Sequence, residues 1–173
     1  MGRFVIAFTI AFTGFSGGEA YSAEWGQPVN GLRMSVSTEA IRTGREIQVT
    51  LENTGDQNVL VPIGVVVDKA HPVFLKLLVK TAAGPTRRVI YTRLGFIAGS
   101  AEPWNIPRRP GGSYALRTPI NSYFVLDGTE ELATFILRPC QLWVELECPV
   151  PDKLRPLPCW HGKLVSNLLK LPN

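Results

Sequence analysis

The sequence has little of the chemistry from which catalytic sites are built. It contains only two histidines and three cysteines in 173 residues. A nucleophilic enzyme needs a base within reach of its nucleophile, yet no serine stands in a nucleophile-elbow pattern and no Cys–His spacing is typical of a thiol enzyme. We therefore expect a protein without enzymatic activity, and a hydrolase site assembled around His71 is the least favoured alternative.

Ligands for a bound metal are equally scarce. A blue-copper site needs Cys, His and Met close together near the C-terminus. Cys159 and His161 lie close together, but no methionine follows them. A zinc site needs paired ligands, which the separate positions of His71 and His161 do not supply. Neither a metal nor another cofactor is predicted.

Two pairs of carboxylates are similar in spacing to acid–base pairs but have a simpler interpretation. Glu145 and Glu147 alternate with apolar residues in Gln141–Glu147, which is typical of the solvated outer face of a strand. Glu130 and Glu131 are typical of a charged turn. Both pairs are therefore expected to be structural.

The first 23 residues are predicted to be a signal peptide. Arg3 gives a positive start, and the apolar run Phe4–Phe15 is too short to span a bilayer as a helix. Small residues follow, and cleavage after Ala20 is favoured over cleavage after Ala23. An N-terminal core strand or an uncleaved anchor is the alternative. The protein is thus expected to be exported, to the periplasm, the cell envelope or the medium.

Residues 24–173 are expected to form one domain, because no repeat or low-complexity tract divides them. Cleavage leaves the net charge of +4 unchanged, since residues 1–23 contain one arginine and one glutamate. The basic residues form no cluster with interleaved aromatics, so a nucleic-acid partner is not expected. The expected partner is another envelope or extracellular protein, or a polyanionic surface. No membrane-spanning segment is predicted in the mature chain.

Apolar and polar residues alternate with period two along much of the mature chain, which is typical of strands with one buried face. Prolines and glycines separate these runs at intervals of roughly ten residues. The pattern predicts an all-β, antiparallel two-sheet sandwich. Ile120–Leu126 remains open as one helical turn or a crossover between sheets. The predicted strands are Leu32–Ser37, Glu46–Glu52, Val59–Ile63, Phe74–Lys80, Arg88–Thr92, Ser113–Thr118, Thr134–Leu137, Gln141–Glu147 and Trp160–Asn167.

Four local patterns stand at turns and strand edges. They are Trp25-Gly26 with Asn30-Gly31-Leu32, Leu51-Glu52-Asn53-Thr54-Gly55, Pro110-Gly111-Gly112-Ser113, and Trp160-His161-Gly162 with Ser166-Asn167. In these patterns the chain resembles secreted bacterial immunoglobulin-like domains of largely uncharacterised function. It is also distantly similar to proteinase-inhibitor domains of the bacillary intracellular type. The resemblance implies an immunoglobulin-like sandwich, and it speaks to fold far more than to activity.

The cysteines predict one disulfide. Cys148 ends one predicted strand and Cys159 precedes the next, so a hairpin of these strands would place both at its mouth. Export permits the bond, which would stabilise the fold by roughly 3 kcal/mol. Two unpaired buried thiols are the alternative. Cys140 lies roughly 26 Å from Cys148 along an extended strand, so it is expected to be a buried free thiol.

The segment Gly99–Gly112 is the predicted binding loop. Its prolines stiffen it, which lowers the entropy lost on binding. Trp104, Arg108 and Arg109 are residue types enriched in binding hot spots. The alternative is a plain connection in which Trp104 caps the core and the arginines are solvated.

These observations together predict a non-catalytic, exported, immunoglobulin-like binding or structural module. The alternative function is a proteinase inhibitor that presents Pro107–Pro110 to a trypsin-like enzyme, with Arg108 in the specificity pocket. A stiff basic loop suits that role, although proline-rich loops are also common connectors.

Overall fold

The computed structural model describes residues 24–41, 44–66, 70–91, 102–126, 130–148 and 158–171. The predicted signal peptide and both of its cleavage positions lie outside these residues. Most of the described chain is in strands, and the strands form antiparallel sheets. The prediction of an all-β protein is confirmed.

The first sheet has three strands in the order β1-β2-β8. They are β1 (Leu32–Ile41), β2 (Gly44–Asn53) and β8 (Ser113–Pro119). One polar side chain of the C-terminal segment supports it, because Asn167 bonds the backbone of β1 as a neighbouring strand would. Its Oδ1 accepts a hydrogen bond of 2.6 Å from the amide of Val36, and its Nδ2 donates one of 3.1 Å to the Val36 carbonyl.

The second sheet is the largest, with the order β11-β10-β5-β6-β9 and with β12 also paired to β10. Its strands are β5 (Leu75–Thr81), β6 (Arg87–Tyr91), β9 (Tyr123–Val125), β10 (Cys140–Cys148), β11 (Gly162–Val165) and β12 (Leu169–Leu171). A third, smaller sheet has the order β4-β3-β7. It is formed by β3 (Val59–Val66), β4 (Ala70–His71) and β7 (Glu102–Arg108).

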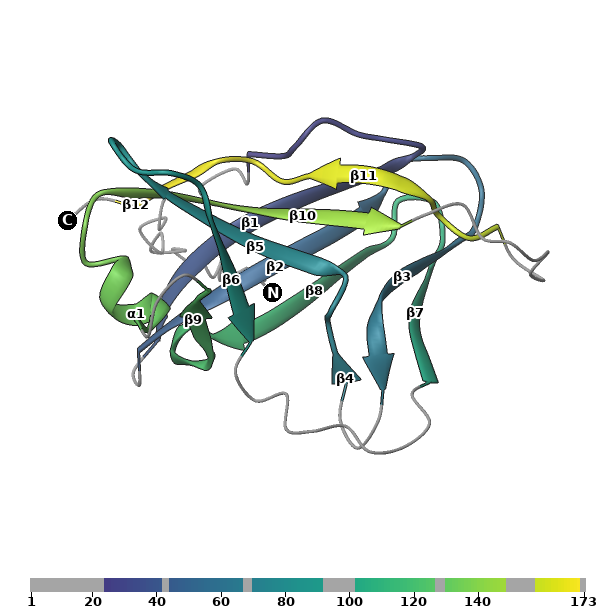
Figure 1. Ribbon diagram of the computed structural model, residues 1–173. Coiled ribbons are helices and arrows are strands. Elements are labelled where there is room, and N and C mark those ends of the chain that lie inside the picture. The colour runs from purple at the N-terminus through teal and green to yellow at the C-terminus, as the bar shows by residue number, and fades with distance from the viewer. Residues whose placement is uncertain are drawn as a thin grey trace, which may run out of the picture.

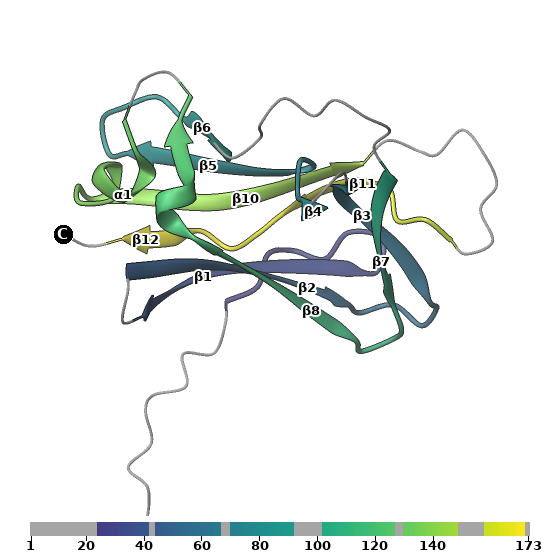
Figure 2. The same ribbon diagram turned by 90° about the horizontal axis from the view of Figure 1, so that it is seen from below.

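The first two sheets lie face to face, and the third lies at one end of these two layers (Figure 1, Figure 2). Apolar side chains at alternate positions fill the space between the layers, since every second side chain of a strand points to the same face. Each fully buried aliphatic side chain stabilises the fold by about 1.5–3 kcal/mol. Buried members include Met34, Val36, Ile47 and Leu51 from the first sheet and Val79, Leu142, Val144 and Leu146 from the second.

One predicted strand is wrong, and one segment that the sequence left open is decided by the structure. Thr134–Leu137 is not a strand, because its residues belong to the short helix α1 (Leu132–Phe135) and to the turn after it. Leu132, Phe135 and Ile136 are the buried residues there, a spacing of three and four that matches a helix. Ile120–Leu126 combines a 3₁₀ turn, η1 (Ile120–Ser122), with strand β9.

Candidate functional site

The predicted binding loop is largely a strand. Glu102–Arg108 forms β7, which pairs antiparallel with β3, so the expectation of an irregular loop over 99–112 is wrong for these residues. Residues 99–101 lie outside the described chain. Pro103 and Pro107 are exposed and stand on β7, which pairs on one side only in the described sheet. A proline cannot donate to a sheet ladder, and it is tolerated on such an edge strand.

Side chains alternate between the two faces of a strand, and this alternation along β7 decides where the predicted site residues point. Trp104 and Arg108 share a face of β7 with the buried Ile106, so both are turned inward and only half-exposed. Trp104 packs against the hydrophobic core. Arg109 follows the strand and is exposed. The structure therefore does not gather the three side chains into one projecting patch.

The guanidinium of Arg108 is held by its own chain. Its Nη1 donates a hydrogen bond of 2.8 Å to the carbonyl oxygen of Ser113, and its guanidinium carbon lies 5.4 Å from the centre of the Tyr114 ring. An open hollow runs beside it, lined by Asn58, Val59 and residues 107–113. An inhibitor needs this side chain extended into a partner, so these contacts do not favour the inhibitor alternative.

The cysteines differ from the prediction in one respect. Cys140, Cys148 and Cys159 are all free thiols, so the predicted Cys148–Cys159 disulfide is absent. The hairpin exists, since β10 and β11 pair antiparallel, but its register places Cys148 opposite Gly162. The backbone of Cys159 instead pairs with that of Leu60 of β3 in an isolated, parallel β-bridge.

Burial keeps two of these thiols protonated. The Cys148 thiol donates a hydrogen bond of 3.3 Å to the carbonyl oxygen of Pro62. Burial, with a smaller contribution from the neighbouring Cys159, raises the pKa of Cys148 to about 11. Burial also raises the pKa of Cys140, which is buried as predicted. A protonated, buried thiol is a poor nucleophile.

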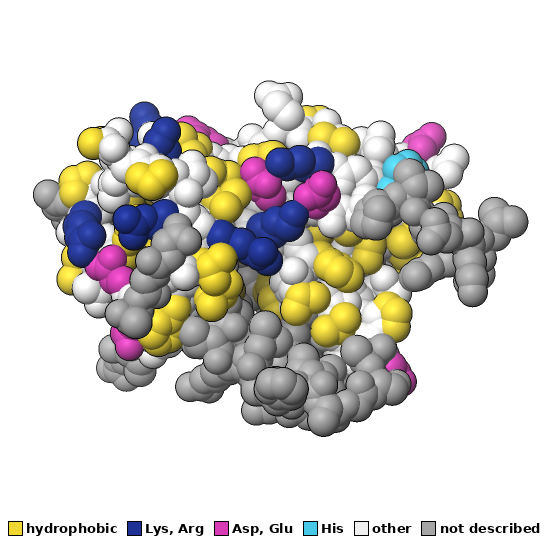
Figure 3. Space-filling model, in the orientation of Figure 1, with side chains coloured by type: hydrophobic (Ala, Val, Ile, Leu, Met, Phe, Trp, Pro, Cys, Tyr) yellow, Lys and Arg dark blue, Asp and Glu magenta, His cyan; other side chains and the backbone are white. Residues whose placement is uncertain are grey.

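Three carboxylates of the predicted pairs bind cations, and two of these, Glu145 and Glu147, stand on β10 of the second sheet. Glu147 accepts a bond of 2.7 Å from Lys76, and Glu145 lies 3.0 Å from Lys163. The hydrogen bond and charge of Lys76 lower the pKa of Glu147. Figure 3 shows basic and acidic side chains side by side over the middle of the face that it presents. Glu130 pairs with Arg138 at 2.5 Å.

Of the two histidines, only His161 has a described side chain. His161 is exposed beside Trp160, whose ring nitrogen donates a hydrogen bond of 3.0 Å to the carbonyl oxygen of Val29. The His71 side chain lies outside the described part of the structure. Among the residues that are described, no three histidine, cysteine or acidic side chains stand close enough to hold a metal ion.

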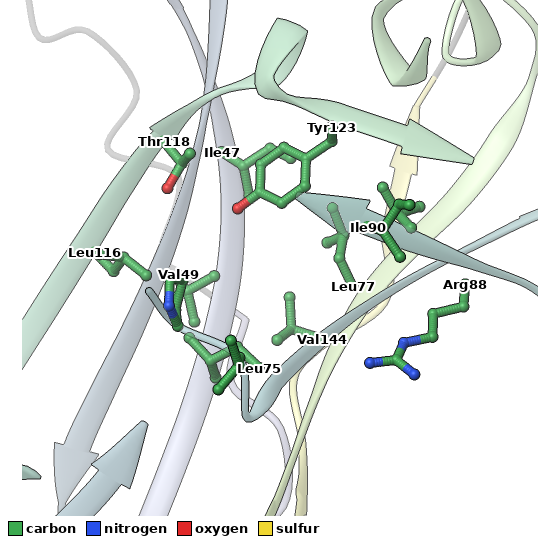
Figure 4. A pocket seen from close by; sticks show the side chains of 13 residues that line it. Ile47, Val49, Leu75, Leu77, Arg88, Ile90, Leu116, Thr118, Tyr123 and Val144 are labelled. Atoms are coloured by element: carbon green, nitrogen blue, oxygen red, sulfur yellow. The ribbon is translucent and has the colours of Figure 1, made fainter. Parts of the chain in front are cut away.

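A cavity of about 110 Å³ lies between the two facing sheets. Its walls come from β2 and β8 on one side and from β5, β6 and β10 on the other, and most of the lining is apolar (Figure 4). The apolar lining includes Ile47, Val49, Leu75, Leu77, Leu116 and Val144.

The two exposed residues of the described lining both belong to β6. Strands β5 and β6 pair only from Leu77 opposite Val89 to Val79 opposite Arg87, and beyond that β6 diverges from β5 (Figure 1). Ile90, 36% exposed, and the exposed Arg88 belong to β6 and line the cavity. The opening is therefore on the β6 side.

Three polar residues contribute to the lining. Thr118 is buried on β8, and Figure 4 shows the hydroxyl group of Tyr123 turned into the group of lining side chains. Arg88 stands at the edge of the group and is the only charged residue among the 13 that line the cavity. None of these 13 described residues is acidic, so the charge of the described lining is positive.

Sequence reasoning missed this cavity because its lining comes from separated segments. The alternation in β2 and β5 predicts that Val49 and Leu77 are buried, but it cannot show that the facing side chains leave space between them. The one local signal is Tyr123, an aromatic with a polar end in the segment whose structure remained open.

The scan against protein-family models finds no match to this chain, and the searches of curated proteins and of solved structures find none either. Within the described residues, none of the helices has the length and apolar character needed to cross a bilayer.

Proposed function

We propose that the protein is a non-catalytic, exported, immunoglobulin-like binding module that takes up an apolar group between its two sheets. The observation that carries the proposal is the apolar cavity between β2 and β5, which is open at its β6 side. Apolar pockets with a few polar groups at the edge are the usual form of a small-ligand site.

The state of the reactive groups supports a binding role over a catalytic one. The thiols of Cys140 and Cys148 are held protonated by burial, and the carboxylates of Glu145 and Glu147 are each engaged with a lysine. Thiols and carboxylates held in this way are not poised to donate or accept a proton in a reaction. Binding of an apolar group requires no such proton transfer.

The immunoglobulin-like assignment rests on the sequence patterns together with the two facing antiparallel sheets. The patterns stand at contacts between distant segments, as expected of fold determinants. Asn30 donates a hydrogen bond of 2.9 Å from its side chain to the carbonyl oxygen of His161, and Ser166 accepts one of 2.9 Å from the amide of Val144. Export rests on the basic, apolar and small-residue character of residues 1–23.

The experiment is a titration with toluene, an uncharged apolar probe, followed through the methyl resonances of the protein. We expect the methyl groups of Val49, Leu77 and Val144 to shift together and to saturate. Methyl groups far from the cavity, such as those of Leu171, should not respond. Shifts scattered over the surface without saturation would contradict the proposal.

A pair of variants on β8 makes the titration specific. Leu116 lines the cavity, so Leu116→Phe should fill part of the space and weaken toluene binding. Ala115 is exposed on the opposite face of the strand, so Ala115→Leu adds apolar volume without entering the cavity. Equal effects of the two changes would show that the probe binds elsewhere.

A further inference from the structure

The inference rests on the proposed function and concerns the charge of the ligand. Arg88 is exposed at the cavity opening, and no ion pair joins it to another of the described residues. Two lysines of the second sheet differ in this respect, since Lys76 and Lys163 each bind a glutamate. Arg88 therefore keeps its full charge available to a ligand.

The size of the cavity limits what enters. An engineered apolar cavity of roughly 150 Å³ binds benzene, whereas whole drug-sized ligands need roughly 300–1,000 Å³. At about 110 Å³ with one open side, this cavity accepts a single compact group, such as one ring or a short branched chain, and the rest of the ligand stays outside. The outside part then meets β6, where Arg88 stands.

We propose that the cavity binds a small apolar carboxylic acid, with its ring or branched chain among Val49, Leu77 and Val144 and its carboxylate at the guanidinium of Arg88. Arginine suits this role because its planar group can hold both carboxylate oxygens at once. None of the 13 described lining residues carries an acidic side chain that would repel the anion. Tyr123 adds a hydroxyl group on the inner side of the same space.

The test compares three probes that carry the same ring and differ in charge: phenylacetate, 2-phenylacetamide and phenethylamine. Dissociation constants are measured by calorimetry on the full mature chain at low ionic strength. We expect phenylacetate to bind about fivefold more tightly than the amide, the ratio for a solvent-exposed ion pair of about 1 kcal/mol. The amine should bind most weakly, because Arg88 repels it.

Two arginines on β6 form a matched pair of variants. Arg88→Gln should remove the preference for phenylacetate over the amide. Arg87→Gln removes the same charge at a residue that does not line the cavity, and it should keep the preference. High salt should narrow the preference in the unmodified protein as well, which tests the charge without any substitution.

Each outcome separates the two proposals. Equal binding of phenylacetate and the amide would overturn the anionic ligand while leaving the binding module intact. A preference that survives Arg88→Gln would overturn the role of Arg88. If none of the three probes binds and toluene does not bind either, the proposed function itself is wrong.

Discussion

The side-chain amide of Asn53, at the end of β2, donates a hydrogen bond of 3.1 Å to the carbonyl oxygen of Arg108, at the end of β7. The same side-chain amide donates a hydrogen bond of 2.7 Å to the carbonyl oxygen of Gln57. Its Oδ1 accepts one of 3.0 Å from the backbone amide of Gly55. Asn53 is only 2% exposed. One buried side chain thus joins the first sheet to the third and fixes the turn between β2 and β3.

Replacing Asn53 with alanine should lower the free energy of unfolding by about 2 kcal/mol, because the carbonyl oxygens of Gln57 and Arg108 lose their donor. Chemical denaturation measures the change. Asn58→Ala, an exposed side chain in the same turn, should change it by less than about 0.5 kcal/mol. Similar losses in the two variants would show that the Asn53 hydrogen bonds are not responsible.

Replacing Trp104 with alanine should cost stability, because its ring packs against the core. Since the residue is half-buried, we expect a loss of about 2 kcal/mol, below the range for a fully buried tryptophan. Arg109→Ala should leave thermal stability unchanged, as the side chain is exposed. A Trp104→Ala protein as stable as the original would revive the hypothesis that Trp104 is an exposed binding anchor.

The Cys148 thiol makes stability depend on alkaline pH. Its pKa is raised to about 11 in the folded protein, so the folded state keeps the proton while the unfolded chain loses it near pH 9. Folding therefore loses stability as the pH rises from about 9 to about 11, because the unfolded state binds fewer protons there. The measurement is the free energy of unfolding across this range.

Cys148→Ala provides the comparison, because it removes this titration and leaves all other groups in place. We expect the stability of the variant to fall less steeply above pH 9 than that of the unmodified protein. Parallel curves would mean that the pKa of Cys148 does not differ between the folded and unfolded states.

Export is tested by the intact mass of the protein recovered from the exported fraction. The basic start, short apolar run and small-residue stretch predict a chain shortened by cleavage after Ala20 or Ala23. A soluble exported product that still carries Met1–Ala20 would refute the signal peptide.

Strands could be predicted from the sequence where apolar residues recur at every second position and are also the buried residues. Leu142, Val144 and Leu146 of β10 alternate with polar residues, and all three are buried. The pattern of Asn53 and Gly55 also marks a real turn, where the side-chain oxygen of Asn53 accepts a hydrogen bond from the amide of Gly55.

The errors came from features that depend on pairing between distant segments. Pro103 and Pro107 indicated a loop, yet an edge strand accepts prolines, and only the partner strand β3 decides between the two. The predicted pairing of Cys148 with Cys159 depended on the hairpin register, which instead places Cys148 opposite Gly162. The cavity depended on how two sheets face each other, and no local pattern encodes that.

The central claim, an accessible apolar space between the sheets, is tested most directly by a crystal structure of the protein under xenon pressure. Xenon occupies dry apolar cavities and makes no hydrogen bonds. We predict one strong xenon peak surrounded by Val49, Leu77 and Val144, and its loss in Leu116→Phe. A space that instead holds ordered waters, or that is closed by the surrounding side chains with no xenon bound, would contradict the account.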